Sequence, residues 1–442
     1  MTRAVRSAVL ITASEPEPRA FGKQVVIGGL LDHLVRRLGP DQVHVVLIGR
    51  EDVDRPTTAY RTHVIAKPPA ADQLRSVVTR VVGRPHTPLQ EAALWSPGVR
   101  DRLRSTLTEI GADLEIWDTM RTGQYAPALT DPTLADPGSA RPNRPRSVLY
   151  ADDLFSKRYA SMLRRIHTDR TRLANPLGEF GKVLPGPARR IVARPLVYRP
   201  LLKLEERLCA RSEDAAPGRF DATILVNPDE TEELTRRSGS DTVRTLLPLL
   251  PEPRSRPERR YRGPEFVFLG GLDFPPNADG LSWFLRECRE PVLDAVPDFR
   301  LLLVGRGTDR DLPEAEAWGD RVRAAGWVDD LDAVLAGAAG LLSPLRFGSG
   351  IKIKVLEALA RGLPVVASPA GVLGLPVGAE QGCLVGDGPA ALAAQLAAAS
   401  APARNDDLSR AARAAWEASY APEVVSRAYD EVLGLSGEVP RA

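Results

Sequence analysis

The chain has 442 residues, which is long enough for two or more domains at roughly 100–200 residues per domain. Hydrophobic residues make up 43% of the sequence and charged residues 26%, which is typical of a globular protein. The formal net charge of +2 argues against a protein that binds nucleic acid through its bulk charge, and we expect no nucleic-acid partner.

The cysteines and the apolar segments indicate a cellular compartment. Cys209, Cys288 and Cys383 are far apart and form no CxxC pair, so we expect reduced thiols. The apolar stretch at residues 8–13 is too short for a secretory signal, and no stretch approaches the ~20 apolar residues that span a membrane. We therefore expect a cytoplasmic protein.

Apolar runs alternate with helical patterns over the first half of the chain. Residues 8–13 predict a buried first strand, and residues 24–38 place apolar side chains at helical spacing. Further strands are predicted at residues 43–48, 114–117, 148–150 and 223–226. Strands and helices with short connections predict a parallel sheet that is covered on both faces.

The same alternation begins again after a segment rich in proline and arginine. Strand-like runs at residues 266–269, 301–304, 340–343 and 364–367 are separated by helical runs such as 278–293 and 331–336. This pattern predicts a second doubly wound sheet. We expect one Rossmann-like α/β domain over residues 1–250, a linker over 251–264, a second such domain over 265–420, and a C-terminal helix over 421–442.

Residues 155–211 form a basic segment, with 14 Lys or Arg against 4 Asp or Glu. We expect helices and loops appended to the first sheet. The segment fits a contact with an anionic lipid or an anionic acceptor, and it fits a solvated face equally well. A peripheral membrane contact is therefore sought here if the substrate is lipid-linked.

The stretch FGSGIKIKVLEALARGLPVV at residues 347–366 joins the predicted strand 340–344 to a helix predicted over residues 351–361. Gly348 and Gly350 lie in the turn, where glycine permits positive φ and close approach of a ligand. The first turn of a helix presents unpaired N–H groups and the positive end of its dipole. The turn is therefore a candidate phosphate site.

Three charged residues strengthen this interpretation. Lys352 and Lys354 lie at the helix N-terminus, where cations are mildly unfavourable unless an anion is bound. Glu357 follows Gly350 by seven residues, which places both nearly on one face of a continuous helix. A carboxylate beyond a phosphate site suits the hydroxyls of a ribose, although an ordinary helix with a solvated charged face gives the same pattern.

This stretch resembles the C-terminal signature of the retaining GT-B glycosyltransferases of family 4, also called group 1. FVFLGGL at residues 266–272, PPNADG at 275–280, LLLVGRG at 301–307 and GWVDDL at 326–331 are similar to family segments in the same order. The shared residues of the signature are Pro344, Arg346, Gly348, Gly350, Lys352, Lys354, Glu357, Ala358, Gly362, Pro364, Val365 and Val366. The resemblance covers residues 266–399 well and the N-terminal half more loosely.

The resemblance implies two Rossmann-like domains that face each other across a cleft, with the last helix crossing back to the N-terminal domain. The C-terminal domain would bind the nucleotide sugar and the N-terminal domain the acceptor. We expect Lys352 and Arg346 to be catalytic, without a metal, together with Asp152 and Asp153, which follow a predicted strand. The implied donor-binding residues are Gly22, Lys23, Gly271, Asn277, Val328, Phe347, Gly348, Ser349, Gly350, Ile351, Lys352 and Glu357.

Within this set the resemblance assigns particular roles. Glu357 would bind the ribose, and Gly348, Gly350 and Lys352 would hold the diphosphate. The main chain at Val328 would contact the base. Gly22 and Lys23 would meet the donor phosphates or the acceptor from the other domain.

The sequence departs from the family pattern at several positions. Ser349 stands where many members have a first glutamate, and Asn277 stands near the position of a lysine. Gly22 replaces a double glycine, and Asp152-Asp153 lie where many members have a histidine. The sequence leaves open whether these two aspartates are a metal pair, a base, an acceptor contact or a turn cap. Other motifs point elsewhere only weakly: Asp329-Asp330 predict a helix N-cap, and Gly305 and Gly307 lack the third glycine of a dinucleotide site.

We therefore expect a glycosyltransferase that moves a sugar from a nucleoside diphosphate sugar, UDP- or GDP-linked, to a small-molecule acceptor in natural product biosynthesis. Since no nucleophile stands beside a base, catalysis would depend on electrostatic stabilisation of the leaving diphosphate, with retention implied by the resemblance. The alternatives are a transferase acting on a polysaccharide or lipid-linked glycan, a nucleotide-sugar epimerase or sugar phosphorylase on the same fold, and an inactive nucleotide-sugar-binding protein. No separate cofactor is expected.

Overall fold

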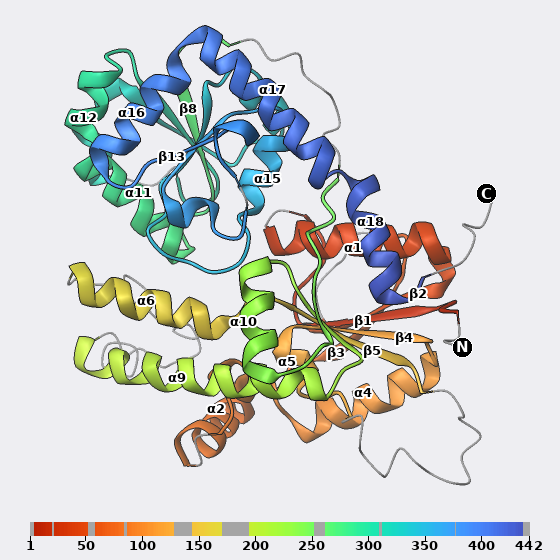
Figure 1. The fold of residues 1–442 in the computed structure, drawn as a ribbon. Helices are drawn as coiled ribbons and strands as arrows, with labels where there is room; N and C mark the ends of the chain where they lie inside the picture. The colour runs from red at the N-terminus through yellow and green to blue at the C-terminus, as the bar shows by residue number, and fades with distance from the viewer. Residues whose placement is uncertain are drawn as a thin grey trace, which may run out of the picture. The chain divides into compact units, whose positions relative to one another are not determined.

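The computed structural model describes residues 4–19, 22–51, 58–83, 86–127, 144–169, 194–251, 261–308, 312–375 and 377–435 (Figure 1). The chain divides into two compact units. The first unit comprises Met1–Tyr159, Pro200–Leu249 and Val425–Ala442, and the second comprises Ala160–Arg199 and Leu250–Val424.

The first unit is built on a parallel sheet of seven strands in the order β3-β2-β1-β4-β5-β6-β7. Its strands are β1 (Ala8–Thr12), β2 (Val43–Gly49), β3 (Arg61–Ala66), β4 (Leu114–Asp118), β5 (Arg146–Asp152), β6 (Ala222–Leu225) and β7 (Val243–Thr245). The strand order reverses between β1 and β4. In open α/β sheets, such a switch point leaves a crevice at the carboxyl ends of the strands, where ligands bind.

Helices cover both faces of this sheet, with α1 and α18 on one face and α4 on the other (Figure 1). Those wholly or partly in the first unit are α1 (Gly22–Leu38), α2 (Ala70–Val77), α3 (Leu89–Leu94), α4 (Pro97–Ile110), α5 (Thr119–Gly123), α6 (Phe155–Asp169), α9 (Pro195–Ala215), α10 (Pro228–Ser238) and α18 (Pro422–Leu433). Short turns of helix are η1 (Pro40–Gln42), η2 (Val78–Gly83) and η4 (Ala216–Gly218). The core between the layers includes the fully buried Trp117 and Phe220.

The second unit repeats this design with six parallel strands in the order β10-β9-β8-β11-β12-β13. The strands are β8 (Glu265–Leu269), β9 (Arg300–Val304), β10 (Val322–Gly326), β11 (Gly340–Ser343), β12 (Val365–Ala367) and β13 (Cys383–Val385). The order reverses between β8 and β11, which places a second switch point at their carboxyl ends.

The helices of the second unit pack on both faces of its sheet (Figure 1). They are α11 (Pro275–Glu287), α12 (Arg289–Ala295), α13 (Pro313–Glu316), α14 (Leu331–Ala336), α15 (Ile353–Ala360), α16 (Pro389–Ser400) and α17 (Pro402–Ser419), with short turns η5 (Gly319–Arg321), η6 (Pro369–Val372) and η7 (Ala379–Gln381). Phe266, Phe284, Phe299 and Trp318 stack in the core, with ring centroids 5.6–6.1 Å apart. Aromatic pairs at this spacing add favourable energy to the burial of their area.

The predicted α/β architecture with two doubly wound sheets is confirmed, and every predicted strand is present. Four strands escaped the sequence analysis, and they are the two edges of each sheet: β3, β7, β10 and β13. Edge strands are short or half-exposed, so they lack the continuous apolar run of a strand that is buried on both faces. The helix predicted over residues 278–293 is two helices, α11 and α12, because Cys288 interrupts it.

The last helix, α18, contacts the first unit, as the resemblance implied. Its Tyr429 is fully buried, and its hydroxyl lies 3.4 Å from that of Tyr150 on β5. Asp430 contacts His33 at 2.9 Å and Arg37 at 3.1 Å, both on α1. Burial is the main reason that the pKa of His33 lies below its ordinary value.

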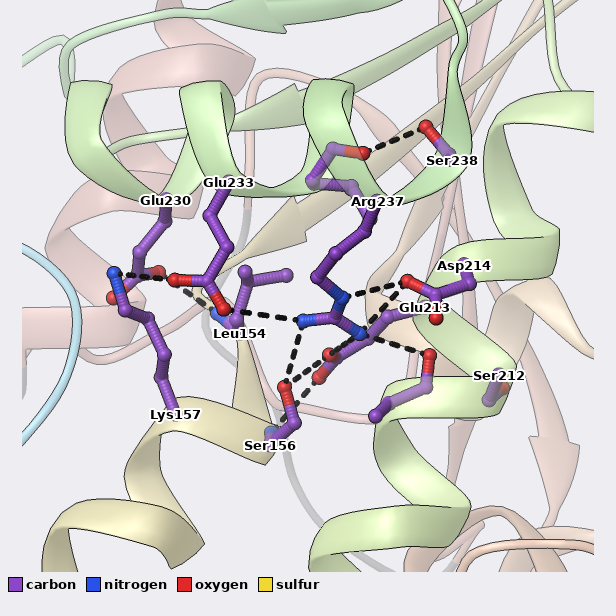
Figure 2. Close-up of polar contacts among 12 residues, drawn as sticks. Leu154, Ser156, Lys157, Ser212, Glu213, Asp214, Glu230, Glu233, Arg237 and Ser238 are labelled. Carbon is purple, nitrogen blue, oxygen red and sulfur yellow. Dashed lines mark hydrogen bonds and ion pairs between the residues drawn. The ribbon is translucent and has the colours of Figure 1, made fainter.

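A network of ion pairs joins α6, α9 and α10 where the predicted basic segment begins (Figure 2). Arg237 of α10 contacts Glu213 at 3.4 Å and Asp214 at 2.8 Å, both on α9. It also lies 3.5 Å from Glu233, which pairs with Lys157 of α6 at 2.9 Å. Within residues 155–211, Lys157 is therefore paired inside the protein, and residues 170–193 of that segment lie outside the described residues.

Candidate functional site

The loop between β11 and α15 lies at the switch point of the second unit. Gly348 and Gly350 have φ of 152° and 64°. Both values lie in the region that favours glycine, so the turn requires these residues, as expected. The loop thereby brings backbone N–H groups of residues 348–352 to the carboxyl edge of the sheet, next to the first turn of α15.

Lys352 forms the start of the helix rather than its first turn. The structure begins α15 at Ile353, two residues later than predicted, with Lys352 in an extended conformation at the N-cap. The argument that Gly350 and Glu357 share a helical face therefore fails, since residues 350–352 are not helical. Lys352 is 9% exposed, and its ammonium donates to the carbonyl oxygens of Ser349 at 2.8 Å and Gly350 at 3.0 Å.

Lys354 places a second ammonium group at the same edge. Its Nζ donates to Oδ1 of Asn277 at 2.9 Å, and the Asn277 Nδ2 donates to the carbonyl oxygen of Gly271 at 3.0 Å. The ammonium also lies 4.9 Å from the centre of the Phe268 ring. Burial lowers the pKa of Lys354 to about 7, and repulsion by Lys352 acts in the same direction. The structure thus collects two cationic side chains around the glycine loop.

Glu357 lies half-buried on α15, one turn before Arg361. Burial raises the pKa of its carboxyl group above the ordinary value, against the attraction of Arg361 and with the repulsion of Asp332. Arg361 contacts Asp332 at 2.6 Å and donates a hydrogen bond to the main-chain oxygen of Glu357 at 2.9 Å. Within the described part of the chain, no hydrogen-bond donor contacts the Glu357 carboxylate, so its oxygens are available to a ligand.

Arg346 has a defined partner that the sequence did not predict. Its Nε and Nη2 donate to the two carboxylate oxygens of Asp279 at 2.8 Å and 2.6 Å. The guanidinium also lies 5.5 Å from the centre of the Trp283 ring on the same helix, α11. Such a bidentate pair fixes the guanidinium in one orientation at the start of the loop.

The remaining predicted residues of the second unit lie near the same edge of the sheet or within the glycine loop. Gly271 follows β8, and Val328 lies half-buried in the turn after β10. Phe347 and Ile351 are 3% and 8% exposed, and they anchor the loop while Ser349 stays more accessible. The sequence analysis grouped these residues through the family resemblance alone, and the contact between Lys354 and Asn277 was seen first in the structure.

The first unit brings Lys23 and Asp152 together at its own switch point. Lys23 follows Gly22 in the first turn of α1, and its Nζ lies 3.3 Å from Asp152 at the end of β5. A second and closer carboxylate, Asp118 at the end of β4, lies 2.7 Å from the same Nζ and was missed by the sequence analysis. Asp118 is 1% exposed and accepts a hydrogen bond of 2.7 Å from Thr12.

These carboxylates determine the charge state of Lys23. Burial lowers the pKa of Lys23, but the attraction of Asp118 and Asp152 outweighs it and leaves the pKa above its ordinary value. Burial raises the pKa of Asp152, and Asp153 and Asp118 add to this effect against Lys23. Asp152 has φ of 72°, unusual for a residue with a side chain, and such conformations cluster at functional sites.

Asp153 does not join this cluster. Its carboxylate contacts Arg158 of α6 at 2.6 Å and is 6% exposed as a residue. The structure therefore separates the two neighbouring aspartates, which the sequence could not distinguish: Asp152 faces Lys23, and Asp153 pairs with a helix. Among the described residues, no group of three His, Cys, Asp or Glu side chains is arranged to hold a metal ion.

Helix length and polarity bear on membrane contact. In the ranges that the structure describes, none of the helices has the length and the apolar character that crossing a bilayer requires. Exposed apolar side chains do occur, such as Leu74 on α2 and Val78 one turn later, at 42% and 51% exposure.

Comparison with known proteins relates the segment that carries the glycine loop to a family. Residues 263–401 match the profile of the family Glycosyl transferases group 1. The chain is 24% identical over 159 residues to an uncharacterized 44.6 kDa protein in the cps region of Klebsiella pneumoniae, a match that covers 34% of this chain and 40% of that protein. It is 36% identical over 110 residues to the phosphatidyl-myo-inositol mannosyltransferase of Mycobacterium leprae, covering 24% of this chain and 28% of that protein.

The matched segments thus span less than half of the length of these curated relatives. The fold likeness extends further: the sucrose-phosphate synthase of Thermosynechococcus elongatus superposes with a TM-score of 0.60 and 18% identity, over 98% of this chain and 100% of that one. Two parallel Rossmann-like sheets and a last helix on the first unit are the features of the GT-B fold. Residues 263–401 are therefore similar to the group 1 glycosyl transferases, and the chain as a whole has the GT-B fold.

Proposed function

We propose that the protein transfers a sugar from a nucleoside diphosphate sugar, with the second unit binding the donor and the first unit contacting the acceptor. One observation carries the donor side of this proposal. Lys352 and Lys354 place two ammonium groups beside a glycine loop with positive φ, at the carboxyl edge of a parallel sheet. A diphosphate suits such a collection of cations and backbone N–H groups.

The donor would lie along α15. The backbone N–H groups of Gly348, Ser349 and Gly350 and the ammonium of Lys352 would hold the diphosphate. The Glu357 carboxylate, which has no donor within the described chain, would accept hydrogen bonds from the ribose hydroxyls. The main chain at Val328 would contact the base, while Phe347 and Ile351 keep the loop in place.

Catalysis would act on the leaving group. As the bond from the sugar to the diphosphate breaks, negative charge grows on the leaving phosphate, and fixed cations stabilise that charge. Lys352 is the cation at the loop, and Arg346 adds a guanidinium that Asp279 holds in one orientation. In the retaining mechanism that the family relation suggests, the acceptor attacks from the face of the leaving group, and the leaving phosphate helps to remove its proton.

The acceptor would be a lipid-linked or glycan molecule rather than a free natural product. The Mycobacterium leprae relative is named a phosphatidyl-myo-inositol mannosyltransferase, and this name favours a lipid-linked acceptor. On the first unit, Asp152 would receive an acceptor hydroxyl; its partly exposed side chain beside Lys23 and its raised pKa support this role.

The donor assignment can be tested by binding. We expect one of UDP, GDP, ADP, dTDP and CDP to raise the melting temperature, since a ligand at 100 times its Kd adds about 2.7 kcal/mol to the stability. Glu357→Ala should weaken that nucleotide by about tenfold or more, which is the value of one or two hydrogen bonds to a charged group. Glu316→Ala, a matched change at an exposed glutamate of the second unit, should leave the affinity unchanged.

Turnover then separates the enzyme classes. The protein is incubated with the sugar of the matching nucleotide and with a lipid extract or oligosaccharide pool, and the products are resolved by chromatography. Transfer or slow hydrolysis supports the proposal. An altered sugar on the same nucleotide would indicate an epimerase, dependence on inorganic phosphate a phosphorylase, and binding without turnover an inactive protein. Equal nucleotide affinity in Glu357→Ala would refute the ribose assignment.

A further inference from the structure

Arg121 of the first unit lies in α5, a short helix that is tied to β1 and β4. The Thr122 hydroxyl of α5 donates to the main-chain oxygen of Asp118 at 2.9 Å and lies 3.2 Å from that of Ile11. Gln124 donates a hydrogen bond of 2.8 Å to the main-chain oxygen of Arg121 itself. The backbone of Arg121 is therefore fixed at the carboxyl ends of β1 and β4, which form the switch point of this sheet.

The turn from β4 into α5 has an unusual backbone. Thr119, the first residue of α5, is 2% exposed and has φ of 65°. In the described ranges, Thr119 and Asp152 are the two residues other than glycine with positive φ, and they lie at the ends of the neighbouring strands β4 and β5. Positive φ is costly for a β-branched residue, and such conformations cluster at functional sites. The two strained residues thus mark one edge of the sheet, where Arg121 also lies.

The Arg121 guanidinium has hydroxyl groups as its partners. Its Nε donates to the Thr119 hydroxyl oxygen at 3.4 Å and its Nη2 to that of Ser14 at 3.3 Å. Both distances are longer than a typical hydrogen bond between nitrogen and oxygen. Among the described residues, no carboxylate contacts this guanidinium and no acceptor contacts its Nη1. The half-buried side chain therefore has N–H groups that are available to a ligand.

Other arginines of the same unit have carboxylate partners. Arg144 forms a bidentate pair with Asp221 at 2.7 Å and 3.0 Å, and Arg158 contacts Asp153 at 2.6 Å. These contacts are short, and they compensate the charge of each guanidinium. Arg121 differs from these arginines because its partners are neutral and its hydrogen bonds are long.

Lys23 adds a second positive charge close to Arg121. Burial lowers the pKa of Lys23, and the charge of Arg121 acts in the same direction. Asp118 and Asp152 outweigh both effects, and they contact the Lys23 ammonium at 2.7 Å and 3.3 Å. The lysine thus pairs with both carboxylates, and an anion supplied by a ligand is the partner that Arg121 lacks. The planar fork of a guanidinium matches the oxygens of a phosphate group.

We propose that Arg121 binds a phosphate group of the acceptor, next to the hydroxyl that Asp152 would receive. This inference rests on the proposed function and deepens it, because it gives the acceptor an anionic group close to its attacking hydroxyl. Ser14 and Thr119 would orient the guanidinium before the phosphate binds, and shorter charge-assisted hydrogen bonds would then replace their long ones. A phosphate ester in solution and a phospholipid head group share this chemistry.

The test is isothermal titration calorimetry on protein whose donor site is saturated with the tightest binder of the five nucleoside diphosphates named above. One probe is glycerol 3-phosphate, with glycerol as its uncharged match. The other probe is a phosphatidylcholine vesicle that contains phosphatidylglycerol, with a vesicle of phosphatidylcholine alone as its match. Binding of the free ester indicates a soluble acceptor, and binding that requires phosphatidylglycerol in the vesicle indicates a lipid head group. Either result supports the inference if it depends on Arg121.

Three variants show whether the binding depends on Arg121. Arg121→Gln should bind the probe about tenfold or more weakly than the unmodified protein, because a charge-assisted contact is lost. Its affinity for the nucleotide should stay within about twofold. Lys203→Gln, which removes an exposed lysine of the same unit, is the matched control and should bind the probe as the unmodified protein does. Arg121→Lys keeps the charge but loses the fork, so its affinity should lie between the two.

Several results would overturn the inference. They are probe binding by Arg121→Gln within about twofold of the unmodified protein, an equal loss in Lys203→Gln, and no binding of either probe. A parallel loss of nucleotide affinity in Arg121→Gln would place the guanidinium at the donor instead. If Arg121→Gln does not fold, Arg121→Lys decides, and full affinity in that variant would contradict the role of the fork. Failure of the unmodified protein to bind any of the five nucleotides would overturn the proposed function, whereas normal nucleotide binding with any of the results above would overturn this inference alone.

Discussion

At the scale of single residues, Asp118 is a buried carboxylate whose ion pair with Lys23 matters for the stability of the first unit. It is 1% exposed, accepts a hydrogen bond from Thr12, and contacts the Lys23 ammonium at 2.7 Å. Removing one member of a buried ion pair leaves the other charge uncompensated, which is more destabilising than the pair itself is stabilising. Lys23 would then depend on Asp152 alone.

We therefore predict that Asp118→Ala lowers the stability of the first unit by about 3–5 kcal/mol. Hydrogen exchange of peptides from β1, β4 and β5 measures this free energy locally, without assuming that both units unfold together. Asp41→Ala is the matched control, because Asp41 and Arg61 form a pair of the same kind with side chains 78% and 60% exposed. Its effect should stay within about 1 kcal/mol. A loss for Asp118→Ala no larger than that would contradict the predicted role.

At the scale of elements, α10 and α14 each begin at a side-chain cap that follows a local sequence rule. Asn227 accepts a hydrogen bond from the Asp229 N–H at 2.9 Å at the start of α10, and Pro228 occupies the first helical position. Asp330 accepts from the Ala333 N–H at 2.9 Å at the start of α14, which confirms the N-cap predicted for Asp329-Asp330 and identifies the residue. Both caps satisfy N–H groups that have no partner within the helix.

This pair of neighbouring aspartates offers a matched test of helix capping. Asp330→Ala should lower the stability of the second unit by about 0.5–2 kcal/mol, because the Ala333 N–H loses its acceptor. Asp329→Ala changes the same charge at an exposed position and should cost less than about 0.5 kcal/mol. Hydrogen exchange of a peptide covering α14 reports both values. Equal losses in the two variants would assign the effect to charge and not to the cap.

At the scale of the whole molecule, the same plan occurs twice. Each sheet reverses its strand order once, between β1 and β4 in the first and between β8 and β11 in the second. Each reversal gathers charged side chains at the carboxyl ends of the strands, and their balance differs. Carboxylates compensate Lys23 in the first unit, while Lys352 and Lys354 gather beside the glycine loop in the second. This difference supports the proposal that the anionic donor binds to the second unit and the acceptor to the first.

The end of the chain stabilises the first unit through α18. We predict that Tyr429→Ala lowers the stability of this unit by about 3–5 kcal/mol, because a fully buried aromatic ring leaves a cavity. Val424→Ala, at a 44% exposed position of the same helix, should cost less than about 0.5 kcal/mol. Hydrogen exchange of peptides from α1 and β5 is the measurement. Unchanged protection of these peptides in Tyr429→Ala would mean that α18 contributes little to the unit.

The sequence by itself determined the central strands, several helices such as α1, α14 and α15, and the glycine loop, because these features depend on local patterns. Continuous apolar runs mark strands buried on both faces, and the positive φ of Gly348 and Gly350 is required by their own turn. The sequence did not predict the four edge strands, since a strand that is paired on one side and partly exposed has no such run. The family resemblance likewise rested on a contiguous stretch and its order along the chain.

Only the tertiary structure decided which charges meet. Asn277 and Lys354 are 77 residues apart in sequence, and Lys23 and Asp152 are 129 residues apart. The partners of a lysine depend on how strands and helices from distant parts of the chain assemble, which no local pattern records. The tertiary structure therefore gave Asp152 and Asp153 different partners and brought Asp118 to Lys23 and Asp279 to Arg346. It also left Lys354 beside a neutral amide. Packing of distant segments decides these contacts, and the residues next to each side chain in sequence do not.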